Sequence, residues 1–264
     1  MSQFERAIIR DLPDTFADGI TPGLFGVADV ELARKQHQSY KETLEKLGLK
    51  ITRLPKDNAY PDSCFVEDPA IVTDKVAILN NLGAGTRKGE ASIILPALQE
   101  IYGDRIERIE APGTVEGGDI CEAGNHFFIG LSRRTNEEGA YQLAKILEKY
   151  GYTSSIISIR SFRNILHLKT GISYLGNNTV ICHSLIANDC GLDGYKKLVV
   201  KDNEEYASNC ILVNGKVIMP KGFPDAIRQV KEAGFEVVEL EMSEFMKQDG
   251  GLSCLSLRIP KLSS

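Results

Sequence analysis

The fold of this chain is constrained most by one pattern that recurs along it. Two short apolar segments flank a tight turn, an amphipathic segment with helical periodicity follows and stops at a glycine, and another apolar segment comes next. Such spacing predicts a hairpin, a helix and a further strand. Between Asp62 and Glu241 the hairpins recur about every 40 to 60 residues, a period typical of units that stack or form a ring.

The predicted segments can be given in chain order. They are a helix over 29–47 and a strand over 49–54; strands 64–72 and 76–80, helix 91–102 and strand 105–110; strands 118–122 and 126–130, helix 136–150 and strand 154–160; strands 170–175 and 179–183 with a less regular stretch to 201; and strands 210–213 and 216–219, helix 224–233 and strand 235–241. Four of the helices end at a glycine, as helices commonly do.

The two ends of the pattern are incomplete in complementary ways. The first unit has a helix and a strand without a full leading hairpin, and residues 255–259 form a lone strand without a helix. Pairing 255–259 with 7–10 would complete a fifth unit and close a ring. Because no proline-rich or serine-rich linker interrupts the chain, we expect one closed domain over residues 1–264.

Composition excludes several classes of function. The net charge of -5, without a basic face, argues against a nucleic-acid partner. No apolar stretch approaches the roughly 18 residues of a membrane helix, and residues 1–10 contain no signal-peptide core. The six cysteines form no C-x-x-C pair, which favours reduced thiols, a cytoplasmic location and no structural metal site.

A candidate nucleophile lies in Asp249–Cys254, with the sequence DGGLSC. The two glycines allow close backbone approach and present Cys254 at the start of an apolar strand. A thiol becomes a catalytic nucleophile only with partners that manage its proton, commonly a histidine oriented by a carboxylate. Glu116, in the sequence TVEGGD, is the candidate carboxylate. Its alternative interpretation is a solvated acid in a turn.

Only four histidines compete for the role of the base. His37 lies on the apolar face of its predicted helix, His126 borders a turn and His183 ends a strand, which are ordinary structural positions. His167 begins a predicted strand and is the best candidate. In a closed ring the first strands of all units converge near the axis, so His167 can meet Cys254 there.

Charged residues elsewhere predict the substrate. Asp62, Glu67 and Asp68 surround an apolar pair, and in a strand Asp62 and Asp68 would share one face while Glu67 takes the other. Buried acids are costly unless a cation neutralises them. Arg87 and Arg134 each connect a hairpin to a helix and could hold a carboxylate in bidentate fashion, or be solvated surface charge. Together these residues favour a zwitterionic amino acid with a cationic side chain.

Six motifs in order suggest a family: Ala17–Thr21, Phe65–Asp68, Ala111–Asp119, Arg134–Asn136, His167–Gly171 and Asp249–Cys254. Nearly end to end, the chain resembles the dimethylarginine dimethylaminohydrolases of the guanidine-modifying superfamily. The resemblance implies a five-bladed α/β-propeller and hydrolysis of Nω-methylated arginines to citrulline, without a cofactor. The reaction would pass through a covalent S-alkylthiouronium intermediate.

The resemblance also implies roles for nine residues. Cys254 would be the nucleophile, His167 the general acid and base, and Glu116 the orienting carboxylate; Glu67 and Asp68 would lie by the guanidinium, Asp62 and the Ile20 carbonyl near the α-amino group, and Arg87 and Arg134 on the α-carboxylate. Residues 21–26 correspond to the segment that forms a mobile lid in the family.

Three alternatives stay open. The arginine deiminases share the glycine-rich loop, histidine and cysteine, but typically have His-x-Asp where this chain has His167-Leu168-Lys169, so Lys169 favours a methylated substrate. A non-catalytic binding ring and a cysteine peptidase are the other two, and neither explains the acids together with the arginines. A homodimer through outer strands is also open.

Overall fold

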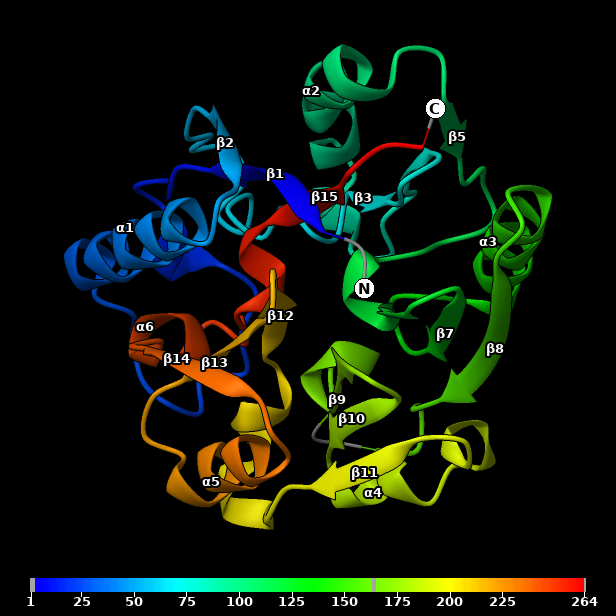
Figure 1. Ribbon diagram of the computed structural model, residues 1–264. Coiled ribbons are helices and arrows are strands. Elements are labelled where there is room, and N and C mark those ends of the chain that lie inside the picture. Colours follow the sequence, from blue (N-terminus) through cyan, green and yellow to red (C-terminus); the bar gives the residue numbers. More distant parts are fainter. Residues whose placement is uncertain (1–2, 163–164, 264) are drawn as a thin grey trace.

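The computed structural model describes residues 3–162 and 165–263, apart from the side chain of Cys190. In these ranges the chain forms five three-stranded sheets around a central axis, with the long helices on the outside (Figure 1). Each sheet holds an antiparallel pair and a third strand parallel to the middle one. The predicted ring of five ββαβ-type units, a five-bladed α/β-propeller, is confirmed.

Four units follow one another in the chain. They consist of β3 (Ala70–Val72), β4 (Ala77–Leu79), α2 (Glu90–Tyr102) and β5 (Ile106–Arg108); β6 (Ile120–Ala123), β7 (His126–Leu131), α3 (Glu137–Lys149) and β8 (Thr153–Ser158); β9 (Ile172–Gly176), β10 (Thr179–Cys182), α4 (Ser184–Ala187) and β11 (Lys196–Val199); and β12 (Ile211–Val213), β13 (Lys216–Pro220), α5 (Pro224–Glu232) and β14 (Glu236–Leu240), after which comes α6 (Ser243–Met246). The less regular stretch predicted before residue 201 is the unit whose helix, α4, has a single turn.

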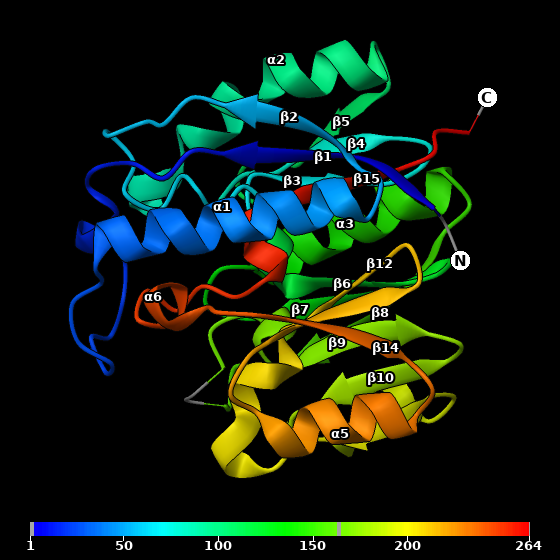
Figure 2. The ribbon, with the colours of Figure 1, turned by 60° about the vertical axis from the view of Figure 1, so that its left-hand side comes forward.

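The fifth unit joins the two ends of the described chain. Strand β15 (Leu257–Pro260) pairs antiparallel with β1 (Phe4–Arg10), and β1 pairs parallel with β2 (Lys50–Leu54). Helix α1 (Val30–Lys46) connects β1 to β2 and lies along the outside of this unit (Figure 2). The predicted ring closure is therefore confirmed, and it fixes the segment before β15 close to the axis.

Helix α1 illustrates how the sequence specifies the outer layer. The Asp29 side chain accepts hydrogen bonds from the backbone N–H groups of Glu31 and Leu32, which caps the helix. Tyr40 and Leu44 are completely buried on its inner face. Burying one such side chain contributes about 1.5–3 kcal/mol. None of the helices in the described ranges is long and apolar enough to span a membrane.

One predicted strand is wrong in extent. Only β3 of the predicted strand 64–72 is extended, and the residues before it form consecutive turns, with the Phe65 N–H bonded to the Asp62 carbonyl. The reason is that this segment's backbone bonds to other groups: the Phe65 carbonyl accepts from Arg87 and the Glu67 N–H donates to the Cys254 carbonyl. These turns bring the segment's acids to the axis.

The predicted starts of two other strands also differ from the structure. His167 precedes the short 3-10 helix η4 (Leu168–Thr170) instead of beginning a strand, and Cys254 lies within the 3-10 helix η7 (Ser253–Leu255). Each of these 3-10 helices lies directly before a strand, η4 before β9 and η7 before β15. The catalytic candidates therefore lie on turns that are fixed by the strands following them.

Candidate active site

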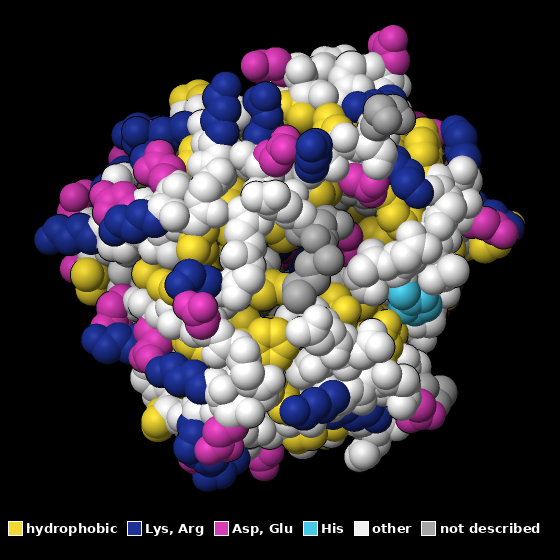
Figure 3. All heavy atoms as spheres, viewed as in Figure 1, with side chains coloured by type: hydrophobic (Ala, Val, Ile, Leu, Met, Phe, Trp, Pro, Cys, Tyr) yellow, Lys and Arg dark blue, Asp and Glu magenta, His cyan; other side chains and the backbone are white. Residues whose placement is uncertain are grey.

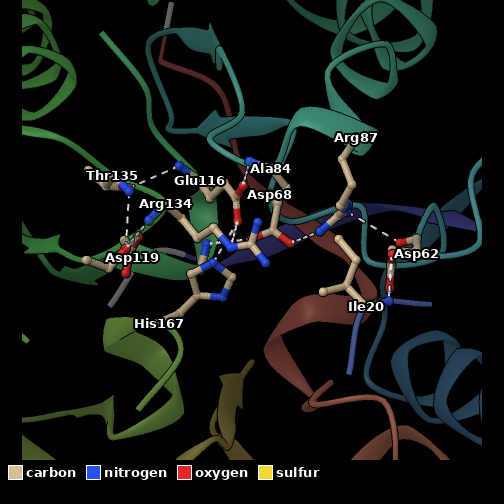
Figure 4. A network of polar contacts seen from close by, with 12 residues as sticks. Ile20, Asp62, Asp68, Ala84, Arg87, Glu116, Asp119, Arg134, Thr135 and His167 are labelled. Atoms are coloured by element: carbon tan, nitrogen blue, oxygen red, sulfur yellow. Dashed lines mark hydrogen bonds and ion pairs between the residues drawn. The ribbon is translucent and has the colours of Figure 1, made fainter. Parts of the chain in front are cut away.

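One cavity at an end of the axis collects most of the predicted site. Its lining includes Ile20, Asp62, Asp68, Arg87, Glu116, Arg134, His167 and Cys254. These residues come from all parts of the chain, and Figure 4 shows many of them pointing toward one another. Glu67 is the one predicted site residue that does not line this cavity.

The imidazole of His167 is held by Glu116. Its Nε2 lies 2.8 Å from Glu116 Oε2, and the other carboxylate oxygen accepts a hydrogen bond of 2.8 Å from the Ala84 N–H (Figure 4). Gly118 packs against the ring, and a Cβ atom there would lie 2.6 Å from His167 Nδ1. The glycine is thus required for His167 to occupy this place. Glu116 itself is 1% exposed, so it is not the solvated turn acid of the alternative interpretation.

Carboxylates surround His167 and control its proton. Burial lowers its pKa, but the charges of Asp119, Asp68 and Glu116 outweigh burial and raise the pKa to about 9. The ring is therefore an imidazolium at neutral pH and can act as an acid. Asp119 also accepts from the Leu168 N–H at 3.0 Å, which holds the turn that follows His167.

Cys254 is presented by a loop that packs unusually closely. A Cβ on Gly250 would lie 2.3 Å from the Phe65 ring, and a Cβ on Gly251 would lie 2.4 Å from Asn209. The Gly251 N–H also points at the sulfur, with a distance of 3.4 Å from N to Sγ. The two glycines therefore allow the loop of Cys254 to pack closely against Phe65 and Asn209.

The thiol is neutral in these surroundings. Burial raises the pKa of Cys254 to about 12, and the negative charges of Glu67 and Asp68 act in the same direction. A cation bound beside the sulfur would lower that pKa. This electrostatic arrangement suits a substrate that brings its own positive charge.

Asn209 is a positioning residue that the sequence did not reveal. Its Nδ2 donates to the Lys169 carbonyl and to Ser253 Oγ, both at 3.1 Å, and its Oδ1 accepts from the Ser253 N–H at 2.9 Å. One buried side chain thus joins the loop of Cys254 to the turn after His167. The sequence around it contains no motif that distinguishes it from other asparagines.

Arg87 lies in the cavity wall, and each of its three guanidinium nitrogens already has a protein partner. It donates to Asp68 Oδ2 at 2.6 Å, to the two oxygens of Glu90 at 2.9 and 2.8 Å, and to the Phe65 carbonyl at 3.0 Å. Burial raises the pKa of Asp68, but Arg87 and His167 outweigh it and leave the pKa lowered. Arg87 therefore keeps Asp68 ionised, and Glu90, three residues on, is its second partner.

Arg134, beside Glu116, and Asp62, at one end of the network in Figure 4, differ in the groups that they leave free. Arg134 Nε lies 4.0 Å from Glu116 Oε2, which is beyond hydrogen-bond range, and its side chain is 20% exposed. Both oxygens of Asp62 lie 3.2 Å from the Ile20 nitrogen, so the Ile20 backbone is held against that carboxylate. The predicted neighbourhood of Asp62 and Ile20 is present in the structure.

The predicted lid segment follows Ile20, beside the part of the cavity that Asp62 lines. Residues 21–26 form an irregular loop in which Leu24 is 75% and Phe25 53% exposed, followed by Val27 at 80%. Thr21 Oγ1 donates to the Lys247 carbonyl at 2.7 Å, which anchors the loop's beginning beside the cavity. Its role as a lid stays a prediction.

Glu67 and Lys169 lie on the other side of the site. Glu67 bonds to Lys169 Nζ at 2.5 Å and to Ser253 Oγ at 2.7 Å, and these groups line a second cavity of about 420 Å³. Figure 3 shows the molecule hollowed near the middle of the face seen in Figure 1, beside the start of β1. The structure does not place Glu67 in the cavity where the guanidinium was expected, and because the segment consists of turns, the alternation of a strand does not explain its separation from Asp62 and Asp68. Lys169 likewise contributes no group to the first cavity.

Three side chains here have the geometry to hold a cation. Ligand atoms of Asp68, Glu116 and His167 lie within 4.8 Å of one another. Each already has a protein partner, and His167 carries a proton at neutral pH, which competes with metal binding. The chemistry of this donor set therefore favours proton transfer.

Comparisons with known proteins agree with this arrangement. The arginine deiminase family model matches residues 55–208. The N(G),N(G)-dimethylarginine dimethylaminohydrolase of Pseudomonas aeruginosa is 42% identical over 97% of this chain and 99% of that protein. The chain belongs to the dimethylarginine dimethylaminohydrolase family.

Solved structures of that family have the same fold. A cysteine-to-serine variant of the Pseudomonas aeruginosa enzyme, complexed with citrulline, superposes with a TM-score of 0.94 at 41% identity, covering 97% of this chain and all of that one. An adduct of a dimethylarginine dimethylaminohydrolase histidine-to-glycine variant with S-methyl-L-thiocitrulline superposes equally well, with a TM-score of 0.94 at 41% identity and the same coverage. The predicted family and fold are thereby confirmed.

Proposed function

We propose that this protein hydrolyses Nω-methylated arginines to citrulline and methylamine or dimethylamine. The observation that carries the proposal is the meeting of Cys254, the His167–Glu116 pair and the ionised Asp68 in one cavity. A nucleophile, a protonated imidazole and an anion are the groups needed to attack a guanidinium carbon. The names and ligands of the related enzymes support the same reaction.

The first half of the reaction transfers the amidine carbon to sulfur. Asp68 holds the substrate's guanidinium beside Cys254, and the substrate's charge lowers the thiol's pKa until the thiol releases its proton to solvent and the thiolate forms. The sulfur adds to the guanidinium carbon. The methylated nitrogen then accepts the proton of His167 and departs as the amine, leaving an S-alkylthiouronium on Cys254.

The second half restores the enzyme. His167, now neutral, removes a proton from water, and the resulting hydroxide adds to the thiouronium carbon. The C–S bond breaks, the thiolate leaves, and the proton lost from oxygen passes to the thiolate, which gives the neutral ureido group of citrulline and the neutral thiol of Cys254. His167 is again the imidazolium, held by Glu116 at 2.8 Å. No step needs an organic cofactor or a metal ion.

The rest of the substrate would lie along the cavity toward Asp62. We propose that Asp62 and the Ile20 carbonyl bind the α-amino group and that Arg134 binds the α-carboxylate. Arg87 was also expected on the α-carboxylate, but each of its three guanidinium nitrogens already has a protein partner, so we propose that it acts mainly by holding Asp68. Glu67 acts from behind the site, where it bonds to Ser253, next to the nucleophile.

Hydrolysis of unmethylated arginine is the second candidate, favoured by the match to the arginine deiminase family. Lys169 points into the second cavity and cannot itself contact a guanidinium. Position 169 nevertheless supplies no second acid to the first cavity, and an unsubstituted guanidinium has more N–H groups to satisfy. That difference favours the methylated substrate.

The deciding experiment measures citrulline release from asymmetric dimethylarginine, monomethylarginine and arginine side by side. We expect turnover of the two methylated substrates, little with arginine, and none with Cys254→Ser. A preference for arginine would make the protein a deiminase. Activity of Cys254→Ser equal to the wild type would remove Cys254 from the mechanism.

We also propose that the protein acts as one catalytic domain in the cytoplasm and that copies pair through outer strands. The described cysteine side chains, which are those of Cys64, Cys121, Cys182, Cys210 and Cys254, are all free, as expected in a reducing compartment. The outer strands leave unpaired backbone groups that can pair with a second copy. Sedimentation at micromolar concentration measures whether dimers form.

A further inference from the structure

A second buried carboxylate lies beside the catalytic pair. Asp119 is completely buried, does not line the substrate cavity and ends the short 3-10 helix η3 (Gly117–Asp119), which directly follows Glu116. Figure 4 shows it on the side of His167 that faces away from Asp62. The proposed mechanism assigns no step to Asp119, although burying a carboxylate is costly unless it is hydrogen-bonded and its charge is balanced.

Three donors hold the Asp119 carboxylate in one place. Its Oδ1 accepts from the Leu168 N–H at 3.0 Å, its Oδ2 accepts from the Ser132 hydroxyl at 2.6 Å, and the Thr135 side chain also bonds to it. Gly130, on β7, leaves the necessary space, because a Cβ atom there would lie 3.2 Å from Asp119 Oδ1 and 2.7 Å from Leu168 Cβ. The place of this acid is therefore fixed on several sides.

The same bonds lead to both members of the catalytic pair. Leu168 directly follows His167, so the bond from its N–H to Asp119 fixes the backbone next to the imidazole. Thr135 Oγ1 accepts from the Glu116 N–H at 3.2 Å, so Thr135 joins Asp119 to the backbone of Glu116. Asp119 is thus connected to the backbone on both sides of the 2.8 Å contact between His167 Nε2 and Glu116 Oε2.

The charge of Asp119 is balanced by His167. Among the described residues no lysine or arginine forms an ion pair with Asp119, whereas the buried Asp68 pairs with Arg87. Burial raises the pKa of Asp119, and the positive charge of His167 opposes this rise most strongly. Burial likewise lowers the pKa of His167, and Asp119 is the charge that raises it most. Each partner therefore favours the charged form of the other.

Other ionisable groups also face the His167 ring. They are Asp68 with Arg87 behind it, Glu116 with Arg134 beside it, Asp249 and Cys254. All of them line the substrate cavity. Asp119 does not, so its charge can be removed without removing a group that touches the substrate.

We infer that Asp119 is a positioning residue, which holds the His167–Glu116 pair in place and is the buried counter-ion of the imidazolium. The inference rests on the proposed function, because it concerns the acid that protonates the departing amine. A neutral side chain at position 119 would leave a ring that binds its proton more weakly. Fewer molecules would then carry the imidazolium that the first half of the reaction needs.

The test is an NMR titration of the histidine rings in the full-length protein. The chain has only four histidines, and the signal that is lost in His167→Gln belongs to His167. Asp119→Asn removes the charge and keeps the shape and one oxygen acceptor. We expect the pKa of His167 to be about 9 in the wild type and about 1–3 pH units lower in Asp119→Asn. The alkaline limb of the kcat profile for monomethylarginine should move in the same direction.

Two further variants separate charge from structure. Glu204 is a buried acid outside both cavities that accepts from the N–H groups of Asp225 and Ala226 at 3.1 and 2.6 Å, so Glu204→Gln is the matched control and should leave the titration and kcat unchanged. Ser132→Ala keeps the charge of Asp119 and removes its 2.6 Å bond. It should lower kcat about tenfold through misalignment and shift the titration less than Asp119→Asn does.

The outcomes separate this inference from the proposed function. A folded Asp119→Asn protein in which His167 titrates as in the wild type would overturn the inference. If Asp119→Asn does not fold, the wild type decides, because a His167 pKa at or below about 6.5, the value of a free imidazole side chain, excludes a counter-ion that dominates burial. The titration needs no turnover, so inactivity toward methylated arginines would overturn the proposed function and leave the test of Asp119 intact.

Discussion

Replacing Asn209 by alanine should reduce catalysis without changing substrate affinity. Asn209 does not line the cavity, but it joins the backbone and hydroxyl of Ser253 to the Lys169 carbonyl. Its loss would free the Cys254 loop to move relative to the turn that follows His167. Catalysis depends on that alignment, whereas substrate affinity depends on the far end of the cavity.

The magnitude follows from the bonds that are lost. Three buried hydrogen bonds at about 1 kcal/mol each lower the free energy of unfolding by about 3 kcal/mol. A displacement of about 1 Å between reacting groups costs up to about a hundredfold in rate, so kcat should fall about 10- to 100-fold. KM for monomethylarginine should stay within about twofold.

Urea denaturation and steady-state citrulline formation measure the two effects. Thr73→Ala is the matched control, because Thr73 Oγ1 accepts from the Val76 N–H at 3.0 Å and the Lys75 N–H at 3.1 Å in the turn between β3 and β4, without contacting either catalytic loop or Asn209. It should lower the free energy of unfolding by about 2 kcal/mol and leave kcat unchanged. An Asn209→Ala protein that is folded and keeps wild-type kcat would refute the reasoning.

Other changes probe the remaining parts of the site. Because the pKa of Cys254 is about 12, its alkylation by iodoacetamide, corrected with Cys254→Ser, should accelerate about tenfold per pH unit from pH 7 to 11; a plateau below pH 9 would contradict this. Gly118→Ala would press a methyl group on His167, and citrulline assays should find kcat at least a hundredfold lower in a folded protein. Lys169→Met breaks the ion pair with Glu67 outside the substrate cavity, so the ratio of kcat/KM for monomethylarginine and arginine should stay within threefold; a larger shift would place Lys169 beside the substrate.

The fold was predictable because its signals are local and repeated. Gly48, Gly103, Gly151 and Gly234 follow the helices or their last turns, and all have positive φ in the structure. Each unit repeats the same order of hairpin, helix and strand, so one ambiguous unit could be interpreted from the others. Where the repeat weakens, at α4, the sequence predicted only irregularity.

The site was less predictable because it depends on contacts between distant segments. Glu67 was expected beside the guanidinium, and only the structure shows that it meets Lys169 behind the nucleophile. Asn209 carries no local motif at all. Its importance follows from the bridge that it makes between two loops.

The pairing of β1 with β15 also sets the order in which activity can arise. Ala7 faces Arg258 across this pair, a contact between opposite ends of the described chain, and such long loops are the slowest to close during folding. Cys254 lies just ahead of that strand. In a refolding experiment the four internal units can therefore become native while the enzyme is still inactive. The rate at which citrulline production returns then reports the pairing of β1 with β15.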